Sequence, residues 1–215
     1  MSRPGASVRI LILVSGDGTN LQALIDAEKQ GGLGPGKIAA VISDHPGAYA
    51  LERARAAGIP ALAEPVNSAQ PKAERRRDLS DRILGAARDR DIGLIILAGF
   101  LSILEGGLIT AYSGRIINLH PSLLPKFGGA GMYGERVHRA VLEAGETESG
   151  CTVHLVDAGT DTGPILLLRR VPVLAGDDPA SLAERVHREE HIAIVEAAAG
   201  MAERIRDGYT QERHT

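Results

Sequence analysis

Short apolar runs alternate with longer, helix-like stretches through the first half of the chain, and this alternation limits the folds open to it. The runs are apolar on both faces, as in strands of a parallel sheet that helices cover on both sides. We expect strands at 8–14, 37–43, 60–66, 92–97 and 115–120. We expect helices between them at 19–30, 46–58, 73–90 and 105–114. This order predicts an α/β fold with a doubly wound, mostly parallel, Rossmann-like sheet.

The pattern changes after residue 145. Two strand-like segments, 150–157 and 163–174, are separated by a turn that is too short for a crossover helix, so they predict an antiparallel hairpin. A terminal helix is expected at about 179–206. Because no linker or repeat interrupts the sequence, we expect one domain over residues 1–215, with an N-terminal half of about 8–100 and a second half of about 101–206.

Composition and charge exclude several classes of protein. The 215 residues are 44% hydrophobic and 24% charged, which is ordinary for a globular protein. A formal net charge of −3 gives no global basic field, so we expect no nucleic-acid partner. The apolar runs are far shorter than the ~20 residues of a membrane span, and no signal-cleavage pattern follows the first run. We therefore expect no membrane association and a cytoplasmic location. The single cysteine, Cys151, excludes an intrachain disulfide.

The segment VSGDGTNLQAL predicts the end of a strand, a glycine-rich turn and the start of a helix. Gly16 and Gly18 allow close approach of the backbone to a ligand, and a helix start presents free N–H groups to an anion. Thr19 or Asn20 is expected to cap the helix. Leu21 occupies the place of a third dinucleotide-binding glycine, and no Walker lysine is present, so we expect a single phosphate. The alternative is a turn that needs glycine for structural reasons alone.

The segment RIINLH delivers two polar side chains to the end of a predicted strand. Asn118 and His120 are two residues apart and therefore share one face of the strand. An amide donor beside a histidine can stabilise an oxyanion on a carbonyl carbon. Asp157 or Asp161, in the turn DAGTDTGP, can approach His120 and favour its protonated form. The alternatives are a hydrogen-bonded structural histidine and aspartates that only make the turn.

The segment LAGFLSIL follows another predicted strand, and ligands of open α/β sheets bind beyond the carboxyl ends of strands. Phe100, Leu101, Ile103 and Leu104 can line a slot for a flat ring, or pack in the core. The segment ERRRD at 74–78 is expected to form a solvated helix face.

Two other histidine positions bear on function. His154 lies mid-strand and is expected to be a hydrogen-bonded polar group near the site. His187 and His191 are one helical turn apart, which is a spacing that can hold a metal. Because no third ligand is evident, we expect no metal.

Taken together, these segments resemble the folate-dependent formyltransferases. The resemblance runs from about residue 8 to 200 and is carried by ILVSGDGTNLQAL, LAGFLSIL, INLHPSLLP, GCTVHLVD, GTDTGPIL and RVHREEH. The Asn-x-His-Pro-Ser motif is typical of the superfamily, and the SGDGTN-type turn is typical of its glycinamide ribonucleotide branch. The resemblance implies formyl transfer from 10-formyltetrahydrofolate to the amine of glycinamide ribonucleotide in purine biosynthesis, without a metal or a covalent intermediate.

The resemblance also implies roles for individual residues. Its catalytic positions are Asn118, His120 and Asp161. Its ribonucleotide-binding positions are Gly18, Thr19, Asn20, His187 and Glu190. Its folate-binding positions are Lys72, Leu101, Ser102, Ile103, Leu104, Asn118, Asp157, Ala158, Gly159, Thr160 and Asp161.

The chain departs from well-known members of the family at three places. Ser102 stands where many members have an arginine, and His187 stands where some have a phosphate-contacting glutamine. The glycine-rich segment 127–137 is longer than in the shorter members, and we expect it to be a flexible loop that closes over the site.

Other functions stay open at this point. One is a formyltetrahydrofolate deformylase or another folate-dependent N-formyltransferase. Another is a non-catalytic phosphate-binding module, which would have no use for Asn118, His120 and Asp161 together. The expected partners are the two small-molecule substrates, with the chain as a monomer or a homodimer.

Overall fold

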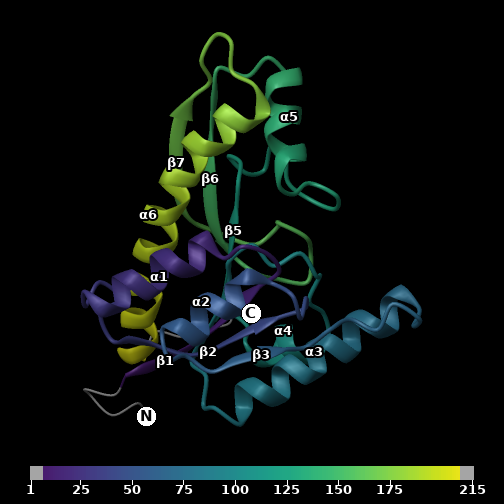
Figure 1. The fold of residues 1–215 in the computed structure, drawn as a ribbon, viewed down its shortest axis with the longest axis vertical. Coiled ribbons are helices and arrows are strands. Elements are labelled where there is room, and N and C mark those ends of the chain that lie inside the picture. The colour runs from purple at the N-terminus through teal and green to yellow at the C-terminus, as the bar shows by residue number, and fades with distance from the viewer. Residues whose placement is uncertain (1–6, 209–215) are drawn as a thin grey trace, which may run out of the picture.

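The computed structural model describes residues 7–208, which form a seven-stranded sheet with helices on both faces (Figure 1). The strands lie in the order β3-β2-β1-β4-β5-β6-β7. Neighbours among β1 to β5 are parallel, whereas β6 pairs antiparallel with both β5 and β7. The strands are β1 (Val8–Val14), β2 (Gly36–Ser43), β3 (Ala61–Ala63), β4 (Leu94–Leu97), β5 (Ile116–His120), β6 (Glu148–Leu155) and β7 (Ile165–Pro172). The predicted fold class is confirmed.

The helices divide between the two faces of the sheet. The residues of α1, α2 and α6 pack into one hydrophobic cluster with the sheet, and those of α3 and α4 pack into a second cluster on the opposite face. The helices are α1 (Thr19–Lys29), α2 (Tyr49–Ala56), α3 (Lys72–Arg88), α4 (Gly107–Ala111), α5 (Glu135–Glu143) and α6 (Pro179–Arg206).

The two-faced apolar character of β1 explains why this strand lies inside the sheet. Ile10 and Ile12 point into the first cluster, and Leu11 and Leu13 point into the second, all of them fully buried. Successive side chains of a strand face opposite sides, so a continuous apolar run serves a sheet that is covered on both sides.

The helix α6 matches its predicted range and packs along the sheet from β7 to β2. It packs on β6, β7, α1 and α5, and Figure 1 shows it running along the β6–β7 hairpin towards α1. Asp178 starts the helix with a capping box, in which its carboxylate accepts from the backbone N–H of Ser181.

The helix α5 was not predicted, and it corrects the extent assigned to the glycine-rich segment. Residues 135–137 belong to α5 and not to a loop, so the irregular segment ends at Gly134. Val137 and Val141 lie one turn apart on its buried face. The preceding run of glycines obscured this short amphipathic pattern, because glycine is a poor helix former.

Other differences concern the ends of elements. The strand β3 covers only three of the residues predicted at 60–66, since Pro60 and Pro65 bracket it and proline has no N–H for a ladder. Neither Thr19 nor Asn20 caps α1: the N-cap is Gly18, and no side-chain cap is formed. Gly18 takes this place because its φ is 74°, in the left-handed region.

The extent of the domain stays a prediction, because both ends of the range 1–215 lie outside the described residues. In the described part of the chain, no helix combines the length and the apolar character that a membrane crossing requires.

Candidate active site

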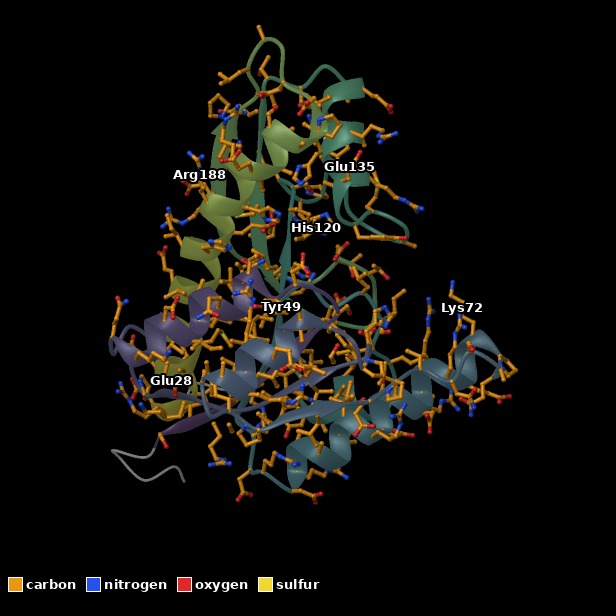
Figure 2. The ribbon with its side chains drawn as sticks, viewed as in Figure 1. Glu28, Tyr49, Lys72, His120, Glu135 and Arg188 are labelled. Atoms are coloured by element: carbon orange, nitrogen blue, oxygen red, sulfur yellow. The ribbon has the colours of Figure 1, made fainter. Side chains whose placement is uncertain are left out.

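A cavity of about 1140 Å³ opens at the carboxyl ends of the parallel strands. The sheet order places the topological switch point between β1 and β4, and the cavity is lined by the segments that follow β4 and β5. Figure 2 shows His120, the last residue of β5, near the middle of the molecule, with Lys72 at the outer end of α3. The topology of the fold therefore creates this cavity.

Asp161 is the centre of a polar cluster in this cavity. Its Oδ1 accepts from Asn118 Nδ2 at 3.3 Å, and its Oδ2 accepts from the backbone N–H of Gly129 at 2.9 Å. His120 Nδ1 lies 3.5 Å from Oδ2, and His154 Nε2 lies 3.5 Å from Oδ1. Four groups from three parts of the chain thus surround one carboxylate.

Strand register brings three of these side chains together. Asn118 and His120 lie on one face of β5, and Leu119 between them packs into the hydrophobic core. Asn118 pairs with His154 of the antiparallel strand β6, so the second histidine stands directly beside the amide. The expectation that His154 lies near the site is confirmed, and Asn118 Nδ2 donates to its Nε2 at 3.1 Å.

Backbone carbonyls determine which ring nitrogens of the histidines carry protons. His154 Nδ1 donates to Leu155 O at 2.8 Å. Its Nε2 accepts from Asn118 when the ring is neutral and donates towards Asp161 Oδ1 when the ring is a cation. His120 Nε2 donates to Phe127 O at 2.8 Å. A proton on Nδ1 of His120 would point at Asp161 and make this imidazole a cation.

The surroundings of Asp161 favour its carboxylate form. Burial raises the pKa of Asp161, but the contacts with His154 and the N–H of Gly129, together with the nearby imidazole of His120, outweigh burial and hold the pKa below its usual range. Asp161 therefore supplies a negative charge beside His120 at neutral pH.

The other candidate aspartate does not approach His120. The Oδ1 of Asp157 accepts from Gly159 N at 2.9 Å and from Thr162 Oγ1 at 2.7 Å, which are contacts within its own turn. The turn requires a glycine at position 163, because a Cβ there would lie 1.9 Å from Leu155 O. Of the two alternatives left open by the sequence, Asp161 is thus the one beside His120.

The segment after β4 forms one wall of the cavity. Leu101 is exposed, and its backbone N–H donates to Ser15 Oγ at 2.8 Å, which holds the segment against the end of β1. Ser102 Oγ donates to the buried Asp44 at 2.6 Å. Phe100 and Leu104 line the cavity but are mostly buried in the core. Core packing is therefore confirmed for Phe100 and Leu104, and the slot for a flat ring stays a prediction.

The start of α1 lies at another wall of the cavity. Asn20 Nδ2 donates to Glu190 Oε2 at 3.3 Å, and His187 Nδ1 lies 2.5 Å from the same oxygen. Glu190 is buried, whereas the His187 side chain is 52% exposed and lines the cavity. Two elements far apart in sequence, α1 and α6, thus meet at one carboxylate.

Most of the residues singled out in the sequence line this one cavity. Those on the cavity wall are Asn20, Lys72, Leu101, Ser102, Ile103, Leu104, Asn118, His120, Gly159, Thr160, Asp161, His187 and Glu190. Those not on the wall are Gly18, Thr19, Asp157 and Ala158.

Several residues of the cavity wall were not singled out in the sequence, Arg75, Arg76 and His138 among them. Arg75 and Arg76 are partly buried and line it beside Lys72, so the prediction of a solvated face at 74–78 is wrong for these two arginines. His138 of α5 is buried against the cavity and was not considered. The apolar residues Val137 and Val141 are four positions apart, which was the available signal for a buried helix face that also includes His138. Across residues 7–208, no group of three His, Cys, Asp or Glu side chains is arranged to hold a metal.

The fold and the cluster define a class of site. The cluster holds an amide donor, an imidazole donor and a carboxylate beside them, and it contains no serine or cysteine nucleophile. Such a site suits a reaction in which one substrate attacks the carbonyl carbon of the other directly, because the two donors can stabilise the resulting oxyanion.

Comparison with known proteins identifies the family. The chain matches the formyl transferase family over residues 8–198. It is 40% identical over 184 residues to phosphoribosylglycinamide formyltransferase of Escherichia coli (strain K12), covering 86% of this chain and 82% of that protein. The solved structure of glycinamide ribonucleotide transformylase 1 from Symbiobacterium toebii has a TM-score of 0.83 and 43% identity, covering 92% of this chain and 88% of that chain. The chain therefore belongs to the formyl transferase family.

A longer relative shows a different organisation. The chain is 44% identical over 192 residues to the trifunctional purine biosynthetic protein adenosine-3 of Drosophila melanogaster. The match covers 89% of this chain but 14% of that protein, so the chain corresponds to one part of the trifunctional relative.

Proposed function

We propose that this protein transfers the formyl group of 10-formyltetrahydrofolate to the amine of glycinamide ribonucleotide. The observation that carries the proposal is the cluster of Asn118, His120 and Asp161 at the end of β5, beside a cavity with room for two substrates. The names of the E. coli and Symbiobacterium relatives support the same substrate. The reaction would serve purine biosynthesis, in the cytoplasm.

The chemistry follows from the donors in the cluster. The amine nitrogen attacks the formyl carbon, and the carbonyl oxygen becomes an oxyanion that Asn118 Nδ2 and His120 Nε2 stabilise. In the structure, His120 Nε2 donates to Phe127 O, and Asn118 Nδ2 donates to Asp161 at 3.3 Å. The oxyanion would therefore replace these two acceptors.

The step is completed by a proton transfer. The bond between the formyl carbon and N10 of the folate breaks, and the proton that leaves the amine reaches N10, through water or the His120–Asp161 pair. The Asp161 carboxylate lies 3.5 Å from His120 Nδ1, and the imidazolium form, in which both ring nitrogens donate, is the form of His120 that best stabilises an oxyanion. This scheme requires neither a metal nor a covalent bond between the protein and the formyl group.

The walls of the cavity suggest where each substrate binds. We assign the pterin ring to the segments 101–104 and 157–161, of which 101–104 and 159–161 line the cavity. We assign the acidic tail of the folate to Lys72, Arg75 and Arg76. The phosphate of the ribonucleotide is assigned to the start of α1 at 18–20, and its ribose to Glu190. In this scheme the N-terminal half of the domain binds the phosphate, and the second half carries catalysis and most of the folate contacts.

The test is to follow the absorbance of 10-formyltetrahydrofolate with and without glycinamide ribonucleotide. Turnover that depends on the ribonucleotide is the expected result. Consumption of the folate without it would replace the proposal by a deformylase, and no consumption in either case would refute a formyl-folate reaction.

A His120→Ala variant separates an enzyme from a binding module. We expect it to bind both substrates and to lose turnover by about 10²–10⁴-fold, because an oxyanion donor with acid–base function is removed. Full activity of this variant would exclude the mechanism given above.

A further inference from the structure

We propose that Asp44 is a positioning residue for the folate wall of the cavity, the segment 101–104, and that it acts through the hydroxyl of Ser102. The identity of the ligand rests on the proposed function, whereas the link between Asp44 and the wall is argued from contacts within the structure. The consequence is that the Ser102 hydroxyl supports the folate wall and does not donate to the ligand.

The folate wall has no regular secondary structure, because it lies in the connection between β4 and α4. Its shape therefore depends on contacts with other elements. Three buried polar side chains accept hydrogen bonds from this connection, and they come from the ends of β1 and β2 and from α3. The contacts are Leu101 N to Ser15 Oγ at 2.8 Å, Ser102 Oγ to Asp44 Oδ2 at 2.6 Å and Glu105 N to Ser80 Oγ at 3.0 Å.

Asp44 differs from the two serine acceptors in charge and in place. It is 3% exposed, and of the three acceptors it is the one that lines the cavity. Its distance of 2.6 Å to Ser102 Oγ falls in the range of about 2.5–2.7 Å that is typical of a hydroxyl donating to a carboxylate. Such charge-assisted bonds are roughly twice as strong as bonds between neutral groups. Asp44 therefore makes the strongest of the three contacts.

The Asp44 carboxylate depends on Ser102 in return. Within residues 7–208, the bond from Ser102 is the one hydrogen bond that this side chain makes, and its Oδ1 has no partner. His45 Nδ1 lies 3.9 Å from Oδ1, which is too long for a hydrogen bond, on a side chain that is 61% exposed. Loss of the Ser102 hydroxyl would thus leave a buried carboxylate without a donor, which is more costly than the loss of the bond itself.

The contact also determines what Ser102 can offer to a ligand. A hydroxyl has one proton, and this proton is directed at Asp44. Ser102 can therefore accept from a ligand but cannot donate to it. The wall then contacts the ligand through its backbone and its apolar side chains, such as the exposed Leu101, and the Asp44–Ser102 bond fixes where these groups stand.

The first experiment measures KM for 10-formyltetrahydrofolate in Ser102 variants. Ser102→Ala should raise this KM about tenfold, because the wall loses a charge-assisted bond, while kcat and KM for the ribonucleotide change little. Ser102→Thr keeps a hydroxyl and should restore most of the affinity. Ser113→Ala, at an exposed serine after α4 and off the cavity wall, is the matched control and should leave all three constants unchanged.

A double-mutant cycle distinguishes positioning from direct contact. Asp44→Asn keeps the shape of the side chain, and it should raise the same KM about threefold, since a neutral amide oxygen accepts more weakly than a carboxylate. Added to Ser102→Ala, it should cause no further rise, because the bond is already broken. If Ser102 bound the folate directly, Asp44→Asn alone would have no effect. That result, additive effects of the two substitutions, or an unchanged KM in Ser102→Ala would overturn the proposal.

The second experiment does not depend on turnover. Calorimetry measures the Kd of 5-formyltetrahydrofolate, an isomer of the co-substrate without a formyl group on N10, and Ser102→Ala should raise this Kd by the same factor as KM. Thermal unfolding of each variant shows that it is folded at the assay temperature. If Ser102→Ala does not fold, Asp44→Asn and Ser102→Thr still test the proposal.

The experiments also separate this inference from the proposed function. A folate Kd that responds to Asp44 and Ser102 without any turnover would refute the proposed reaction and leave the positioning role standing. Turnover with a KM and a Kd that do not respond to Asp44 would do the reverse.

Discussion

At the scale of single residues, one carboxylate organises the site. Asp161 holds its unusual backbone conformation, with φ of 59°, while it binds the amide of Asn118 and the N–H of Gly129 and faces two imidazoles. Asparagine and aspartate tolerate this left-handed conformation better than most residues. The same residue therefore shapes the turn and charges the site.

Asp161→Asn tests the charge separately from the shape. Asparagine has nearly the same size as aspartate and tolerates the same left-handed backbone conformation, but it carries no negative charge beside His120. We expect kcat to fall by about 10²–10⁴-fold with little change in KM. Steady-state kinetics measure this split, and Asp89→Asn, at the exposed end of α3, is the control. A large rise in KM with kcat unchanged would instead assign Asp161 to substrate binding.

The charge of Asp161 also predicts a dependence of stability on acid. Its pKa is lower in the folded protein than in the unfolded chain, so its contribution to stability is present above the unfolded pKa and is lost as pH falls through the folded pKa. In urea unfolding followed from neutral to acidic pH, Asp161→Asn should lose less stability than the unchanged protein. An identical loss in both would contradict this linkage.

Cys151 is predicted to be unreactive. Burial, aided by the charges of Glu190 and Glu189, raises the pKa of its thiol to about 12. The nucleophilic form is the thiolate, which is scarce at neutral pH and has no access to solvent. Iodoacetamide should label the thiol in denaturant but not in the native protein, as measured by mass spectrometry. Rapid native labelling would show that β6 opens locally.

At the scale of elements, the turn between β1 and α1 depends on one of its two glycines. Gly18 has a φ of 74°, and a Cβ there would lie 2.6 Å from Ala50 Cβ. Gly16 has no heavy atom within 4 Å of the position of its missing Cβ. The first glycine is thus open to substitution, whereas the second is required by the packing of α2.

Substitution of the two glycines by alanine should therefore give opposite results. Gly18→Ala is expected to destabilise the protein by about 1–3 kcal/mol and to raise KM for the ribonucleotide, because the strained turn displaces the start of α1. Gly16→Ala should change neither quantity appreciably. Thermal unfolding and substrate titration measure both, and equal effects of the two substitutions would refute this account of the turn.

At the scale of the whole molecule, stability comes from the two apolar clusters on either side of the sheet. Ile96 of β4 is fully buried in the first cluster, whereas Ile192 of α6 is 48% exposed. Ile96→Ala should lower the free energy of unfolding by about 2–5 kcal/mol, since it leaves a cavity that the rigid sheet cannot fill. Ile192→Ala is the control and should cost much less. Denaturant unfolding measures both, and similar costs would mean that the sheet relaxes around the cavity.

The sequence by itself determined the order of the elements and the class of fold. The period and length of the apolar runs reflect whether a segment is covered on one face or on two, and both can be read from the local sequence. The sequence also pointed to Asn118 and His120, because two polar side chains at a strand end need partners. Local patterns of this kind were hidden where glycines preceded them, as at α5.

The tertiary structure alone decided which residues meet. Only the register of β6 against β5 brings His154 to Asn118, and only the fold of the 157–163 turn selects Asp161 over Asp157. In the same way, the packing of α6 on α1 joins His187 to Asn20 through Glu190. Contacts between residues far apart in a chain depend on how whole elements pack, and no local pattern records that arrangement.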